Sequence, residues 1–309
     1  MKKELFIMIA LLVVAMFVVS ACSSGEATRS SSPRGTLVIE QEVGWDLSKF
    51  NYDELSINTQ NSNPEDIFFS LDGTKMYEIS STSNKLYQYS CSDAWDLGSC
   101  YYETNVNVSE GPLSSNNFKG LFFNSYGDML YLVNNQVITK YNLFTPWDLN
   151  GGITENLTEG YQNPKDIFMQ DNHKFILAKP TDPSGTYQVV YHYFNNVYQN
   201  RFIFWDTDGI DNPQALFFSS DGIKMYVVGK DSRNILQYSL NSPWSFSGSL
   251  DHNNISHMST IRGPGGYVIV DPKIEGLYIN PSGTKLYVVD SSSNKVYQYS
   301  ITNKARGVV

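Results

Sequence analysis

The body of this chain is built from internal repeats, and a repeat constrains a fold more than any other pattern. Five stretches share an apolar segment, a turn and a second apolar segment: residues 66–77, 120–131, 166–177, 215–226 and 276–287. The turns carry Asp-Gly, Ser-Gly or similar chemistry, except that the third copy has Asn172-His173 and is one residue shorter. Two apolar runs joined by a tight glycine turn are typical of a β-hairpin.

Two further strands are predicted after each hairpin. Segments of alternating apolar and polar residues follow, such as Lys85-LYQYS and Lys295-VYQYS, and the third copy offers Tyr187-QVVYHYF. A Trp motif then precedes a fourth strand, which we expect near 99–105, 152–158, 199–205 and 247–252. Four strands in about 50 residues is the period of a β-propeller blade. The repeats therefore predict an all-β propeller of five four-stranded blades.

The two ends of the repeat region complement each other. Trp45-Asp46-Leu47 lies 50 residues before Trp95, whereas the last copy ends where its own Trp would fall. We therefore predict that residues near 45–57 supply the outer strand of the last blade and so remove its open edges. The propeller is expected to occupy residues 36–309 as one domain.

Composition agrees with this fold and excludes some functions. The chain has 21 Tyr, 17 Phe and 5 Trp, which suit pleated strands. Charged residues are 17%, too few for a long disordered chain. The net charge of −9 argues against a nucleic-acid partner.

The first 22 residues have the pattern of an export signal. Lys2 and Lys3 precede an apolar run over 5–19, which is short for a bilayer span. The sequence Val19-Ser20-Ala21-Cys22 resembles the lipobox of bacterial lipoproteins. That resemblance implies a signal peptide over 1–21, palmitate-type lipidation at Cys22 and a lipid anchor in the bacterial cell envelope. Cys22 could instead be incidental to a plain secretory signal or a membrane anchor.

The polar residues after Cys22 are expected to form a tether. Residues 22–35 comprise the lipidated Cys and a Ser-rich stretch without apolar periodicity. Ser23 stands where an Asp would favour retention at the inner membrane, so the resemblance favours the outer membrane. In an exported chain the nearby Cys91 and Cys100 predict a disulfide, the alternative being two free thiols.

The blade repeats themselves resemble a known family. Hairpins of the type SxDGTKMY, followed by NKLYQYS and WDL, are similar to β-propellers of the YVTN, NHL and lactonase type, over about residues 36–303. The resemblance implies the fold and no activity, because such propellers host lactonases, lyases, lectins and non-catalytic binders.

Candidate site residues come from aligning the first strands, which line the channel of a propeller. The residue two positions before the apolar triplet of each strand is Glu65, Lys119, Lys165, Gln214 or Glu275, and the next is Asp66, Gly120, Asp166, Ala215 or Gly276. Two acids, two bases and an amide disfavour a metal, which wants acids without cations. They suit a small polar ligand such as a sugar or an amino acid, or a set of ion pairs with no ligand. A second candidate is Arg262, in the longest connection, 251–273, with a plain insertion as the alternative.

Two functions remain open at this point. Searching the sequence finds no nucleophile elbow, P-loop or dinucleotide fingerprint, so we predict no catalytic residue, metal or cofactor. The favoured hypothesis is a membrane-anchored, non-catalytic binding or scaffolding module for a protein partner or a glycan. The alternative is a hydrolase or lyase acting on a small ester, lactone or polysaccharide at the channel.

Overall fold

The computed structural model describes residues 44–108, 117–160, 163–170, 173–178, 188–193, 197–203, 212–230, 234–245, 256–258 and 273–301. All of them belong to one compact unit, Gln41–Ala305. The signal peptide, Cys22, the tether and Arg262 lie outside these residues. Within the described part of the chain, no helix has the length and apolar character needed to cross a membrane.

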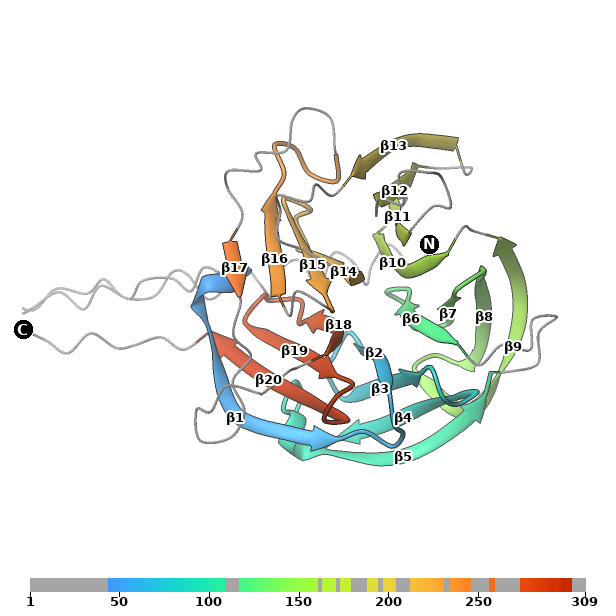
Figure 1. Cartoon of the computed structure of the whole chain (residues 1–309). Helices are drawn as coiled ribbons and strands as arrows, with labels where there is room; N and C mark the ends of the chain where they lie inside the picture. The colour runs from blue at the N-terminus through green and yellow to red at the C-terminus, as the bar shows by residue number, and fades with distance from the viewer. Residues whose placement is uncertain are drawn as a thin grey trace, which may run out of the picture. The chain divides into compact units, whose positions relative to one another are not determined.

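The protein is a five-bladed β-propeller, as the repeats predicted (Figure 1). Each blade is a four-stranded antiparallel sheet, and the first strands of the five blades contact one another around the axis. Blade 1 contains β2 (Pro64–Phe69), β3 (Lys75–Ser80), β4 (Lys85–Cys91) and β5 (Cys100–Asn107). Blade 2 contains β6 (Phe118–Phe123), β7 (Met129–Asn134), β8 (Val137–Thr145) and β9 (Asp148–Gly160).

The other three blades follow the same order. Blade 3 contains β10 (Pro164–Gln170), β11 (His173–Ala178), β12 (Gln188–Tyr193) and β13 (Val197–Ile203). Blade 4 contains β14 (Pro213–Phe218), β15 (Lys224–Gly229), β16 (Asn234–Ser239) and β17 (Ser256–Met258). Its outer strand β17 lies beyond the predicted 247–252, which fall outside the described residues. Blade 5 contains β18 (Ile274–Ile279), β19 (Lys285–Asp290), β20 (Lys295–Ile301) and β1 (Phe50–Asn58).

Ring closure by the N-terminal strand is confirmed. β1 pairs antiparallel with β20, with Phe50 opposite Ile301 and Asn58 opposite Lys295. Just before β1, the backbone N–H of Trp45 donates to the carbonyl of Gly283 at 2.8 Å. The outer strand of the last blade therefore comes from the start of the propeller, and β20 is not left as an open edge.

The Trp motif fastens one end of each blade that carries it. Gly73, in the β2–β3 turn, has φ +74°, and a Cβ there would lie 2.4 Å from the Trp95 ring. The same contact joins Gly127 to Trp147, Gly222 to Trp244 and Gly283 to Trp45. Only glycine gives both the positive φ and the room for the indole. We call this side of the propeller, with its β2–β3-type turns and Trp residues, the Trp face.

At three of the five junctions, the motif also fastens a blade to the one before it. The Tyr77 hydroxyl of blade 1 donates to the Trp147 carbonyl of blade 2 at 2.6 Å. The backbone N–H of Leu149, also in blade 2, donates to Gln88 Oε1 of blade 1 at 2.8 Å. We call these two hydrogen bonds the clamp. Tyr287 and Gln298 bind Trp95 and Leu97 in the same way, and Tyr226 and Gln237 bind Trp45 and Leu47.

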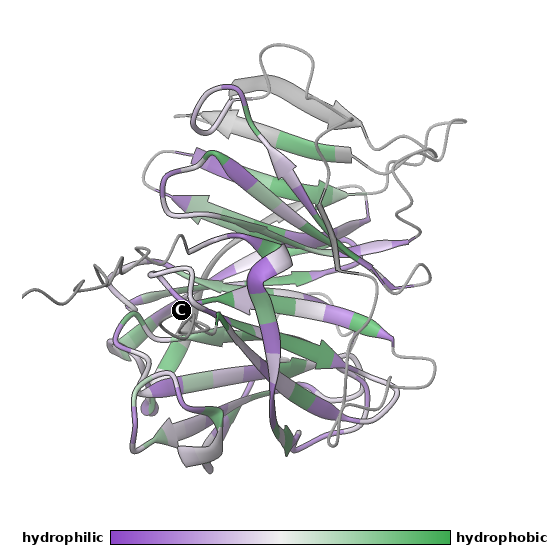
Figure 2. Cartoon of the chain, turned by 90° about the vertical axis from the view of Figure 1, so that its left-hand side faces the viewer, coloured by the Kyte–Doolittle hydropathy of each residue, from purple (hydrophilic) through white to green (hydrophobic). Residues whose placement is uncertain are grey.

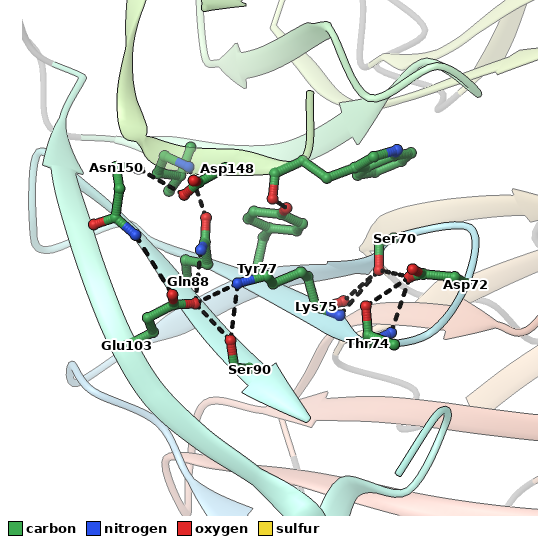
Figure 3. Close-up of polar contacts among 12 residues, drawn as sticks. Ser70, Asp72, Thr74, Lys75, Tyr77, Gln88, Ser90, Glu103, Asp148 and Asn150 are labelled. Carbon is green, nitrogen blue, oxygen red and sulfur yellow. Dashed lines mark hydrogen bonds and ion pairs between the residues drawn. The ribbon is translucent and has the colours of Figure 1, made fainter. Parts of the chain in front are cut away.

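An acid on the outer strand orients the clamp glutamine (Figure 3). Glu103 Oε2 accepts from Gln88 Nε2 at 2.8 Å, Ser90 Oγ at 2.6 Å and Lys75 Nζ at 2.6 Å. Burial opposes ionisation of Glu103, but these donors outweigh it and lower its pKa to about 2. With its amide nitrogen held in this way, Gln88 presents its oxygen to blade 2.

The core lies between the blades, where apolar faces of neighbouring sheets meet. Figure 2 shows hydrophobic residues concentrated along the strands. The largest fully buried side chains include Tyr77, Tyr226 and Tyr287, the three clamp tyrosines. Burying such rings stabilises the fold by roughly 1.5–3 kcal/mol each.

Candidate functional site at the channel mouth

The five predicted residues of the first aligned column occupy the same irregularity. Each first strand has a register shift against the second strand at its second residue, so that a β-bulge contains Glu65, Lys119, Lys165, Gln214 or Glu275. A bulge re-aims the side chain that it carries. These residues lie near the start of the first strands, at the end opposite the Trp face. We call this side, with the five bulge residues around the axis, the mouth.

The structure brings most of these charges into ion pairs. Lys119 Nζ of blade 2 lies 2.7 Å from Glu65 Oε1 of blade 1. Glu275 of blade 5 pairs with Lys230 of blade 4 and accepts from Ser291 Oγ at 2.7 Å. Burial, together with repulsion from Glu65, raises the pKa of Glu275. Lys230, which follows β15, is a member of the mouth that the alignment of first strands did not include.

Lys165 differs from the other charged members of the ring. Its ammonium makes no hydrogen bond or ion pair with the residues that the structure describes. Burial lowers the pKa of Lys165, and the nearby charge of Lys119 lowers it further, against the attraction of Glu65 and Glu275. Of the five aligned residues, Glu65 and Lys119 form an ion pair with each other, whereas Glu275 pairs with Lys230 from outside the alignment. The ring therefore does not neutralise itself completely by pairing, and Lys165 has no ion-pair partner among the described residues.

The fourth-blade member is neutral and is bonded locally. Gln214 is buried, and its Nε2 donates to the carbonyl and to Oδ1 of Asn212, at 3.1 and 2.7 Å. Among the residues that the structure describes, the mouth thus combines the ammonium groups of Lys119, Lys165 and Lys230 with two carboxylates and two side-chain amides.

One residue further in, Asp66 and Asp166 serve the backbone. Asp66 accepts from the N–H of Ile67 at 2.9 Å and, across the blade junction, from Leu121 at 3.0 Å. Asp166 accepts likewise from Ile167 and Leu216, both at 2.7 Å. First strands are sheet edges, so these carboxylates satisfy donors that would otherwise be buried without a partner.

The same two aspartates explain the small residues between them. A Cβ on Gly276 would lie 2.5 Å from Asp66 Oδ1, and one on Gly120 would lie 2.5 Å from Asp166 Oδ1. Burial raises the pKa of Asp166 to about 8, and burial with repulsion from Asp166 raises that of Asp66. Although both were predicted as channel-binding residues, each is bonded within the wall.

Below the aspartates, five aromatic side chains close the axis. Each ring stands edge-to-face against the next, with centroids 5.0 to 5.5 Å apart: Phe68, Phe122, Phe168, Phe217 and Tyr278. A small cavity between the aspartates and this aromatic ring has about 10 Å³ of space, room for about one water. Sequence analysis missed the closure, although an aromatic residue stands at this position in all five copies.

The remaining site predictions have different outcomes. The Cys91–Cys100 disulfide is confirmed, with an S–S distance of 1.98 Å between β4 and β5. Cys22 and Arg262 stay predictions, since both lie outside the described residues. Among the described residues, no three His, Cys, Asp or Glu side chains are grouped so that they could hold a metal ion.

Comparison with known proteins gives no family. No protein-family model matches the chain, and no curated protein matches it. Among solved structures, the Cps50 (Swd1) β-propeller domain of Myceliophteria thermophila has a TM-score of 0.46 at 10% identity, covering 82% of this chain and 100% of that one. A functionally unknown protein from Desulfotomaculum acetoxidans DSM 771 has a TM-score of 0.44 at 13% identity, covering 80% of this chain and 73% of that one.

Proposed function

We propose that this protein is a lipid-anchored, non-catalytic binding module of the bacterial cell envelope, which holds its channel mouth away from the membrane. The observation that carries the proposal is the difference between the two ends of the propeller. The chain enters the propeller at Gly44 and Trp45, on the Trp face. The converging charges lie at the opposite end. A tether from Cys22 would therefore reach the Trp face first.

The exposed apolar residues of the Trp face suit a position near lipid. Leu71, Tyr126 and Ile223 lie in three of its turns and are 56%, 77% and 39% exposed. Contact with a membrane surface costs apolar side chains at turn tips little free energy of desolvation. The same contact would remove hydrating water from the charged groups of the mouth, which is costly. This arrangement leaves the mouth open to a soluble ligand or a glycan.

Binding is favoured over hydrolysis because of what lies below the mouth. Asp66 and Asp166 each accept two backbone N–H groups, and the aromatic ring closes the axis beneath them. The cavity between these two layers has room for about one water, too little for an ester or a sugar ring. A ligand is therefore expected to rest at the mouth without entering the channel.

The anchor and the orientation can be tested together. Replacing Cys22 with Ala should move the protein from the membrane fraction to the soluble fraction. For orientation, Ser62→Cys at the mouth and Ser125→Cys on the Trp face form a matched pair of exposed positions. Each is labelled with a fluorophore, and the lipidated protein is placed in vesicles that contain a headgroup quencher.

We expect stronger quenching at position 125 than at position 62. Equal quenching, or membrane association that survives Cys22→Ala, would refute the anchored orientation. A panel of esters, lactones and polysaccharides tests catalysis. If the protein turns over one of these substrates, and the folded Asp166→Asn variant does not, the hydrolase alternative would be supported.

A further inference from the structure

We propose that the channel mouth binds a small carboxylate through the Lys165 ammonium. This inference rests on the proposed function, since it names the ligand chemistry of the same site. It starts from a count of charges at the mouth. Lys119, Lys165 and Lys230 contribute three positive charges, and Glu65 and Glu275 contribute two negative ones. Among the described residues of the mouth, Lys165 is the charged side chain left without an ion-pair partner, because Glu65 pairs with Lys119 and Glu275 with Lys230.

Each of the two carboxylates already has a cation beside it, although Glu275 Oε2 is buried without a hydrogen-bond partner in the described part of the chain. Glu65 is held by Lys119 at 2.7 Å, and Glu275 by Lys230 and the Ser291 hydroxyl. Both glutamates are almost fully buried, at 3% and 1% exposed, so neither can swing out to Lys165 without breaking these contacts. Lys165 thus lies near two other cations, Lys119 and Lys230, and has no acceptor of its own among the described residues.

A half-buried ammonium without an acceptor has lost part of its hydration and gained no compensation. Burial lowers the pKa of Lys165, because the loss of hydration disfavours the charged ammonium relative to the neutral amine. A ligand carboxylate would supply the missing acceptor and would also be attracted by Lys119 and Lys230. Charge-assisted hydrogen bonds of this kind are the stronger ones in proteins.

The surroundings limit the size and chemistry of the ligand. The amides of Gln214 and Asn212 occupy the next position around the ring and can bond to hydroxyl or amino groups. Deeper entry is blocked by the aromatic closure, because the cavity above it has room for about one water. These features suit a small carboxylate with further polar groups, from either a sugar acid or an amino acid.

Calorimetry on the full-length protein in non-ionic detergent tests the inference. The probes are galacturonate, glutamate, acetate and the neutral sugar glucose, at neutral pH and low salt. We expect galacturonate or glutamate to bind at least tenfold more tightly than glucose, and the tighter of the two identifies the source of the carboxylate. Acetate, which lacks the polar groups, should be weaker than either.

Three substitutions assign the effect to Lys165. Lys165→Gln should weaken carboxylate binding at least tenfold, whereas Lys165→Arg, which keeps the charge, should stay within about threefold. Lys85→Gln makes the same charge change at an exposed position of blade 1 and should have no effect. Melting temperatures of all three variants confirm that they fold. Equal weakening by Lys165→Gln and Lys85→Gln would overturn the inference.

The pH profile provides a readout that a merely structural lysine would not give. Affinity should fall as pH rises through a midpoint below the ordinary lysine pKa of about 10.4, because burial has lowered the pKa of Lys165. Lys165→Arg should remove this midpoint. If no carboxylate binds, or if glucose binds as tightly, the carboxylate site is wrong. None of these measurements uses a membrane, so the lipid anchor stands or fails separately.

Discussion

The junctions between blades are of two kinds, and the difference shows what the repeat motif encodes. Three junctions carry the full clamp, from blade 1 to 2, from 4 to 5 and from 5 to 1. The junctions on either side of blade 3 have other residues at the clamp positions. Lys140 stands in blade 2 where Gln88 stands in blade 1, and Phe175 stands in blade 3 where Tyr77 does.

This comparison separates two roles for the repeated residues. The apolar and glycine positions build each blade, and all five copies keep the apolar ones. The Tyr, Gln and Trp-Asp-Leu positions join a blade to its neighbour. A blade without the clamp therefore has other residues at some of these positions. Blade 3 departs most, and it also carries Lys165, the mouth residue without an acceptor. Ring closure and the clamp together predict three effects of decreasing size.

The largest effect is expected from removing the strand that closes the ring. Deleting residues 36–57 removes β1 with buried Leu47 and Phe50, exposes the edge of β20 and breaks the clamp between blades 4 and 5. Burial of such side chains is worth roughly 1.5–3 kcal/mol each, against a typical total of about 5–15 kcal/mol. Thermal melting should show aggregation or a large drop in melting temperature.

Deleting residues 23–35 is the control for this truncation, because it shortens only the predicted tether. That deletion should leave the melting temperature almost unchanged. Two equally harmless deletions would mean that β1 does not hold the ring closed.

A smaller loss is expected from one clamp residue. Gln88→Ala leaves the buried N–H of Leu149 without an acceptor and removes one of the hydrogen-bond donors to Glu103. This should destabilise the fold by about 1–3 kcal/mol. Lys140→Ala, at the equivalent position of blade 2, is the matched control and should cost less. Denaturant unfolding measures both. Similar losses would show that the clamp is no stronger than the junction without it.

The sequence was sufficient for the fold because hairpin turns and strand alternation are local signals that recur. Ring closure was predictable too, since Trp45 stood one period before Trp95 without a hairpin of its own. The site was only partly predictable. Alignment identified the five bulge residues, but not Lys230, which follows β15 and pairs with Glu275 of the next blade. Nor could it show that Asp66 and Asp166 are bonded to backbone, because which N–H groups lie opposite them depends on how the blades pack.

The smallest effect is a gain, and it asks whether a clamp can be completed where one is missing. The Phe175 ring lies 6.2 Å from the Trp244 ring and 4.3 Å from Phe218. The Tyr77 ring lies 6.4 Å from Trp147 and 4.4 Å from Phe123, so the two sites match. Phe175→Tyr should therefore place a hydroxyl where it can donate to the Trp244 carbonyl.

One added hydrogen bond of this kind is worth about 0.5–1.5 kcal/mol. The gain should appear as a higher midpoint in denaturant unfolding, with an unchanged slope. Tyr77→Phe is the reverse exchange in blade 1 and should lose a similar amount or slightly more, because the Trp147 carbonyl then lacks its donor. Suppose that Phe175→Tyr destabilises the protein while Tyr77→Phe has no effect. The tyrosine hydroxyl would then not distinguish the two kinds of junction, and the difference between them would have to come from ring packing alone.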